Sequence, residues 1–120
     1  MSEHPFKHIS VKENGGAAVV EFVDSKLMYE MTVVNEIGDE LQSLITDHGY
    51  KKIILDFRNV QYLSSTMLGK LAKLDQEVNQ AKGKLKLCGL GPVLKDTFRI
   101  GHFDRVLDVY EDVDSALKTM

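Results

Sequence analysis

The sequence contains little cysteine and proline, no tryptophan and no long apolar run. One cysteine among 120 residues, Cys88, excludes an internal disulfide and a cysteine-rich zinc site, and it fits a reducing compartment. No apolar stretch approaches the ~20 residues that a membrane span needs. The first ten residues lack the apolar segment of a secretory signal. We therefore expect a cytoplasmic protein that does not enter the membrane.

The charge balance is slightly acidic. A formal net charge of −3 argues against direct nucleic-acid binding, because phosphate neutralisation needs a basic face. Hydrophobic residues at 43% and charged residues at 28% are typical of a globular protein. The length fits one domain over residues 1–120, with a core large enough to need no disulfides or metal. A monomer that forms a complex with a different protein is our expectation.

The spacing of apolar residues predicts an α/β fold. Two alternating runs flank Gly15-Gly16, which predicts a β-hairpin. Further along, helical spacing alternates with short β-branched runs, which predicts a mixed sheet with helices packed on it. The expected order is β-β-α-β-α-β-α-β-α: strands at 6–14 and 17–23, a helix at 32–46, a strand at 53–55, a helix from about 66 to 81, a strand at 85–88, a helix at 92–100, a strand at 106–110 and a last helical turn after Asp112.

No motif points to catalysis. The four histidines form no metal-ligand pair, and no nucleophile elbow is present. Gly89-Leu90-Gly91 lacks the third glycine of a dinucleotide fingerprint and the Lys-Ser/Thr of a phosphate-binding loop, so these glycines are expected to serve turn geometry. Cys88, at the end of a strand, is expected to be an inert hydrophobic residue. We therefore expect no enzymatic activity, no cofactor and no metal.

Three hydroxyl residues, Ser64, Ser65 and Thr66, stand where a strand gives way to a helix. A helix cap explains one hydroxyl but not three. Gly69 in the first turns of the helix costs roughly 1 kcal/mol relative to alanine, so either close packing on the sheet or the close approach of a partner favours it. Leu68 lies beside the apolar stripe of this helix, where it either widens the core face or contacts a partner.

The segment from Leu55 to Gly69 resembles the phosphorylation motif of STAS domains, in particular those of bacterial anti-sigma factor antagonists. The family pattern has a buried Leu-Asp strand end, an aromatic or apolar pair, and then Asp-Ser-Ser-Gly-Leu-Gly opening a helix. Ser64 stands here for the family Asp, and Met67 stands for the first Gly. The first change removes an acidic residue, and the second adds bulk at the edge of the site. The stretch 100–104 is also similar to the family.

The resemblance implies a function in partner switching. The unmodified protein would bind an anti-sigma factor that is also an ATP-dependent serine kinase and would thereby free the sigma factor. Phosphorylation of Ser65 would end that binding, and a phosphatase would restore it. Ser64 is the second candidate acceptor, if the turn differs by one residue. The partner-binding surface implied by the resemblance comprises Asp24, Ser64, Ser65, Thr66, Met67, Leu68, Gly69, Lys70 and Gly91.

Two other functions remain open. The first is a STAS scaffold or signalling adaptor that is never phosphorylated, in which Ser64, Ser65 and Thr66 serve only as a helix cap. The second is a small enzyme or a lipid- or nucleotide-binding domain, which nothing in the sequence favours. A phosphate on Ser64 or Ser65 in protein from its own cells separates the antagonist from the adaptor. A retained apolar ligand would favour the binding domain.

Overall fold

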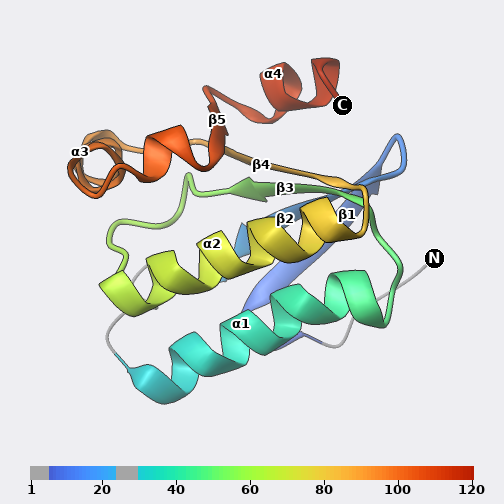
Figure 1. Ribbon diagram of the computed structural model, residues 1–120, viewed down its shortest axis with the longest axis horizontal. Coiled ribbons are helices and arrows are strands. Elements are labelled where there is room, and N and C mark those ends of the chain that lie inside the picture. The colour runs from blue at the N-terminus through green and yellow to red at the C-terminus, as the bar shows by residue number, and fades with distance from the viewer. Residues whose placement is uncertain (1–5, 24–29) are drawn as a thin grey trace.

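The computed structural model describes residues 6–23 and 30–120, and it has the element order expected from the sequence (Figure 1). One short 3₁₀ helix, η1, adds to that order. The elements are β1 (Ile9–Asn14), β2 (Ala17–Phe22), α1 (Met31–Thr46), β3 (Lys52–Asp56), α2 (Ser65–Gln80), β4 (Lys84–Cys88), α3 (Pro92–Ile100), η1 (Phe103–Arg105), β5 (Asp108–Tyr110) and α4 (Val113–Lys118).

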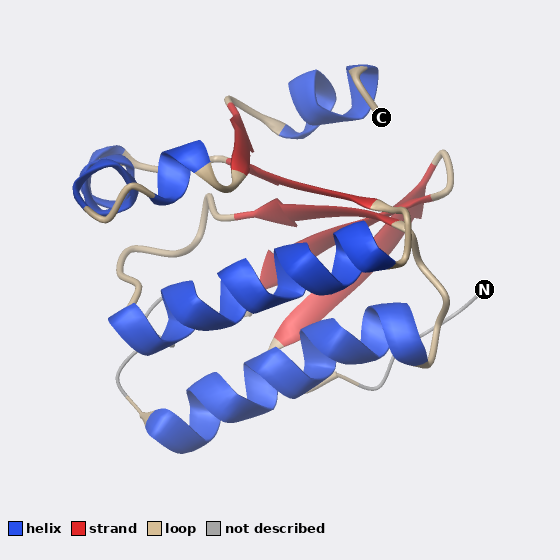
Figure 2. Cartoon of the chain, in the orientation of Figure 1, coloured by secondary structure: helices blue, strands red, loops and turns tan. Residues whose placement is uncertain are grey.

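The strands form one mixed sheet in the order β1-β2-β3-β4-β5. β1 and β2 pair antiparallel, and the other neighbours pair parallel. Helices α1 and α2 lie side by side on one face of the sheet, and the short α4 lies on the other (Figures 1 and 2). Because β2 to β5 are parallel, their carboxyl ends share one edge of the sheet. The turns that follow β3 and β4 therefore meet at that edge, where β2 also ends.

Strand alternation divides the buried residues between the two faces. Ile53 and Leu55 of β3 face α1 and α2 in the main core, which Ile37 and Leu71 of the two helices complete. Ile54 faces α4, in a smaller cluster with Cys88 and Ala116. A strand that is buried on both faces is expected to have a continuous run of apolar residues. The residues of β3 have this pattern and are buried on both faces, so the predicted central strand is confirmed.

Cys88 behaves as the small hydrophobic residue that the sequence predicts. Its side chain is fully buried, and it packs beside Ile54 and Ala116. Burial, together with the charge of Asp56, raises the pKa of the thiol to about 12. The thiolate, which is the reactive form, is therefore scarce at neutral pH.

The structure corrects three details of the sequence prediction. The last strand begins at Asp108 rather than at 106, because the preceding chain forms η1, whose Phe103 ring packs at 6.4 Å from the ring of Phe98. The sequence also allows Tyr62-Leu63 to finish the central strand, but these residues lie in a loop. Helical spacing places Val33 on the apolar face of α1, but the first buried position there is Val34, and Val33 is half-buried. In the part of the chain described, no helix is both long and apolar enough to cross a bilayer.

Candidate functional site

The turn after β3 is held by an ion pair at its base. Asp56 ends β3, and its carboxylate is 1% exposed. Its two oxygens accept hydrogen bonds from the Arg58 backbone N–H at 3.0 Å and from Arg58 Nε at 2.8 Å. Arg58 Nη2 donates a further bond to Glu21 of β2 at 3.0 Å. The Asp56 carboxylate raises the pKa of Arg58, so the guanidinium stays protonated and the buried charge stays paired.

The turn after β4 packs directly against this ion pair. Gly89 has a φ of +74°, in the left-handed region. A Cβ at Gly89 would lie 2.7 Å from Asp56 Oδ1 and 2.8 Å from Arg58 Cγ. Both the backbone conformation and the available space therefore require glycine. Gly91 differs, because its φ of −75° is ordinary and a Cβ there would meet no atom within 4 Å.

Helix α2 begins with a cap that uses only one of the three hydroxyl residues. Ser64 has extended backbone angles, and its Oγ accepts a hydrogen bond from the Met67 N–H at 3.1 Å. Ser64 is therefore the cap that the sequence predicts without assigning it to a residue. Ser65 and Thr66 occupy the first two helical positions and are exposed. The first N–H groups of a helix have no partner within it, so the backbone here presents donors outward.

The next residues of α2 divide between core and surface. Met67 and Leu68 are buried in the main core. Leu68 therefore widens the core face, and the expectation that Met67 adds bulk at the edge of the site is wrong. Gly69 is exposed, and a Cβ there would meet no atom within 4 Å. Packing within the described chain does not account for this glycine.

Lys70 lies along the seam between α1 and α2. A Cβ added to Gly38 of α1 would approach Lys70 Cδ to 2.8 Å. The aliphatic part of the Lys70 side chain therefore packs against α1 at Gly38, where there is no side chain in its way. Lys70 is half-buried there.

Of the residues predicted to bind a partner, Ser65, Thr66 and Gly69 are exposed on α2. Asp24 lies outside the described residues.

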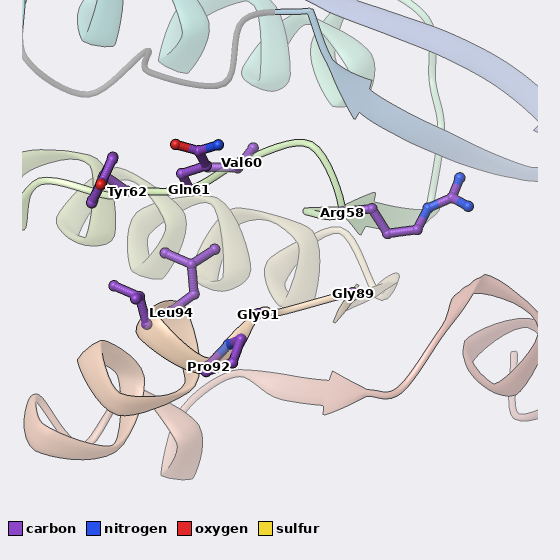
Figure 3. A pocket seen from close by; sticks show the side chains of 9 residues that line it. Arg58, Val60, Gln61, Tyr62, Gly89, Gly91, Pro92 and Leu94 are labelled. Atoms are coloured by element: carbon purple, nitrogen blue, oxygen red, sulfur yellow. The ribbon is translucent and has the colours of Figure 1, made fainter.

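Gly91 belongs to a pocket between the turns that follow β3 and β4. The pocket has a volume of about 400 Å³ and opens at the carboxyl edge of the sheet. Figure 3 shows Val60 and Tyr62 on one wall and Pro92 and Leu94 on the other, with the Arg58 side chain extending away at one end. The lining residues are Arg58, Val60, Gln61, Tyr62, Gly89, Gly91, Pro92, Val93 and Leu94. Apart from Gly91, sequence reasoning missed this pocket as a site.

Exposed apolar side chains gather at the same edge. Val23 follows β2, Tyr62 follows β3, and Val93 begins α3 after β4. Met31, at the start of α1, is also exposed. Their position makes this edge a candidate interaction surface. The only sequence signal for it is an aromatic residue in a polar loop and a valine directly after a proline.

In residues 6–23 and 30–120, no group of three or more His, Cys, Asp or Glu side chains could hold a metal ion. The arrangement is an apolar pocket and an exposed helix start at one edge of a mixed sheet. Fold and surface together define a small α/β domain that presents hydroxyl groups at the start of the helix after its central strand. The chain belongs to the STAS domain family, whose model matches residues 8–116.

One curated relative, and solved structures of similar fold, are named as anti-sigma factor antagonists. A candidate antagonist of Bordetella bronchiseptica, BtrV, is 29% identical over 70 residues, which is 58% of this chain and 60% of that relative's length. The structure of an anti-sigma factor antagonist domain protein from Planctomyces limnophilus has a TM-score of 0.80 at 18% identity, covering 92% of this chain and 96% of that one. Bacillus SpoIIAA, solved in its phosphorylated form, has a TM-score of 0.69 at 13% identity, covering 93% and 99%.

Proposed function

We propose that this chain is an anti-sigma factor antagonist that binds an anti-sigma factor kinase through the exposed start of α2 and is switched off when that kinase phosphorylates Ser65. The observation that carries the proposal is the division of roles between neighbouring hydroxyls. Ser64 caps the helix through Met67, whereas Ser65 is exposed at the first helical position. The Ser65 hydroxyl is therefore available to a kinase without loss of the cap.

The start of a helix suits a phosphoserine. Unpaired N–H groups and the positive end of the helix dipole favour an anion there. A phosphate adds about −1.5 to −2 charges at pH 7. The fold should accommodate that charge, whereas a partner that covers Ser65 would have to desolvate it. Such a penalty lowers affinity by orders of magnitude without a change of shape in the domain.

Gly69 supports a partner that approaches closely. It lies four residues after Ser65, so both face the same side of α2. An exposed glycine inside a helix costs stability, and no described side chain occupies the space beside it. The apolar side chains of Tyr62 and Val93 extend this surface on the neighbouring turns. A protein that covers all of them would bury the Ser65 hydroxyl at its edge.

The experiment that tests the proposal is a pull-down from lysate of the source organism with wild type, Ser65→Asp and Ser65→Ala. We expect wild type and Ser65→Ala to capture a small ATP-binding kinase that Ser65→Asp fails to capture. Incubating that kinase with ATP should then phosphorylate wild type but not Ser65→Ala. If all three variants capture the same proteins and no kinase is among them, the chain is a STAS adaptor, and its hydroxyl run serves only the cap.

A further inference from the structure

The face of the sheet that carries α4 is basic at the end where β3 and β4 begin. Because side chains alternate along a strand, the neighbours of the main-core residues in β1, β3 and β4 project from this face. Three of these neighbours are exposed lysines, Lys12, Lys52 and Lys84. Two more exposed lysines, Lys51 and Lys82, lie on the turns that lead into β3 and β4. We call these five residues the lysine surface.

Direct backbone contact holds the two lysine-bearing turns together. The Lys84 N–H donates a hydrogen bond to the Lys51 carbonyl at 2.7 Å, and a Cβ at Gly83 would collide with that carbonyl oxygen. Lys52 and Lys84 are register partners in neighbouring parallel strands, so their Cα atoms lie about 4.8 Å apart. Like charges at facing strand positions repel each other and lower stability. A bound anion would offset that repulsion.

No carboxylate within the described chain forms an ion pair with any of these five lysines. Glu13 of β1 points to the α1 face, where a tyrosine hydroxyl donates a hydrogen bond to its carboxylate at 3.0 Å. On the α4 face, Glu21 and Asp56 lie at the other end of β2 and β3, where both pair with Arg58. Charge is therefore segregated along the sheet, and the lysine surface keeps its positive potential.

The surroundings of the lysine surface restrict the kind of anion that fits it. Asp75 and Asp108 line the cavity beside Lys84, so carboxylates border the lysines along the outer side of β4. A long polyanion or an anionic bilayer would extend over these acids, and the formal net charge of the chain is −3. The large apolar side chains that are exposed in the described chain all lie outside the strands and turns that carry the lysines, so these segments offer nothing to insert into a bilayer.

A short acidic stretch of another protein matches the size of this surface. Lys12 and Lys84 lie three strand spacings apart, which is about 15 Å. Four or five residues of an extended chain cover that distance. Their carboxylates would therefore contact the lysines without reaching the acidic border.

We propose that the lysine surface binds a short acidic segment of a partner protein, independently of the start of α2. Figure 1 shows that α2 begins at one end of the domain and leads into β4 at the other. The 16 residues of α2 span about 24 Å. A protein bound at Ser65 therefore leaves the lysines uncovered, and one domain holds two partners at once. This inference does not depend on the proposed function, which concerns Ser65.

The test is fluorescence anisotropy with a labelled short peptide of alternating glutamate and serine, at low salt. Wild type should bind this peptide and should not bind a matched peptide of alternating glutamine and serine. Lys52→Glu and Lys84→Glu should each weaken binding about tenfold, because each replaces an attraction by a repulsion. Lys73→Glu is the matched control, since Lys73 is exposed on α2, outside the lysine surface, and the change in net charge is the same. It should change the affinity less than twofold.

Lys84→Gln serves if Lys84→Glu fails to fold, and it should weaken binding about threefold. Ser65→Asp should leave the peptide affinity unchanged, and a loss there would overturn the independence of the two surfaces. Equal losses for Lys73→Glu and Lys84→Glu would show unspecific attraction and overturn the inference. Tighter binding to phosphatidylserine vesicles or to duplex DNA than to the peptide would overturn it in favour of a lipid or a nucleic acid. A wild type that does not bind the peptide overturns the inference and leaves the proposed function standing.

Discussion

Ser64 Oγ accepts a hydrogen bond from the Met67 N–H at 3.1 Å, one residue before the exposed hydroxyl of Ser65. Two adjacent serines therefore have different roles, one in the stability of the helix and one on its surface. The family aspartate that Ser64 replaces belongs to the same group of good helix-capping residues. The substitution thus keeps the cap and removes one negative charge from the surface beside Ser65.

Replacing the two serines should separate these roles. Ser64→Ala removes the cap and should lower the free energy of unfolding by about 1 kcal/mol. Ser65→Ala removes an exposed hydroxyl and should change it by less than about 0.5 kcal/mol. Urea denaturation of both variants measures the difference. A larger loss for Ser65→Ala than for Ser64→Ala would mean that Ser65 is the cap and would weaken the case for its phosphorylation.

Gly69→Ala should make the domain more stable and less able to bind. Alanine in an exposed helix position is favoured over glycine by about 0.5–1 kcal/mol, and the new methyl group meets no described atom. The same methyl group would stand where we expect the partner to approach. Thermal denaturation and calorimetric titration with the anti-sigma factor measure the two effects. A more stable variant with unchanged affinity would place the partner away from this face of α2.

Gly89 and Gly91 should respond differently to the same substitution. Gly89→Ala forces alanine into the left-handed region and against Asp56 and Arg58, so it should cost about 1–3 kcal/mol of stability. Gly91→Ala has open space and an ordinary φ, and should change stability by less than about 0.5 kcal/mol. Denaturant unfolding compares them. Similar losses at the two positions would contradict the packing described for Gly89.

Asp112 should make helix α4 sensitive to acid. Its carboxylate accepts a hydrogen bond from the Ser115 N–H at 2.8 Å, and bonding to Ser115 lowers the pKa of Asp112 below its ordinary 3.8. A lowered folded-state pKa contributes stability that is complete above the unfolded value and is lost as pH falls through the folded one. The loss should therefore begin near pH 3.8 and continue as the pH falls further.

Asp112→Asn tests that titration directly. Asparagine caps a helix about as well as aspartate but does not ionise in this range. Thermal melts between about pH 2 and pH 6 should show the variant losing less stability on acidification than wild type. If the melting temperatures of the two proteins fall equally as the pH is lowered, the acid sensitivity comes from other carboxylates.

Local patterns predicted the element order and most of the core, because both depend on the spacing of apolar residues along one segment. They also predicted a cap within Ser64, Ser65 and Thr66, but not which residue provides it, since that depends on where the backbone turns helical. The pocket could not be predicted, because Tyr62 and Val93 are distant in sequence and meet only through the pairing of β3 with β4. The sequence did not predict η1, because so short a helix shows no periodic spacing of apolar residues.

The contact of Gly89 with Asp56 and Arg58 has a consequence for the kinetics of association. The walls of the pocket are joined where they leave the sheet, since the Phe57 N–H also donates to the Cys88 carbonyl at 2.9 Å. The gap between them is thus set by backbone contacts and exists before any partner arrives. Little conformational entropy remains to be lost from these two turns on docking. Association with a partner should therefore not be slowed by rearrangement of these two turns. Differences in affinity among variants should appear mainly as differences in the dissociation rate constant.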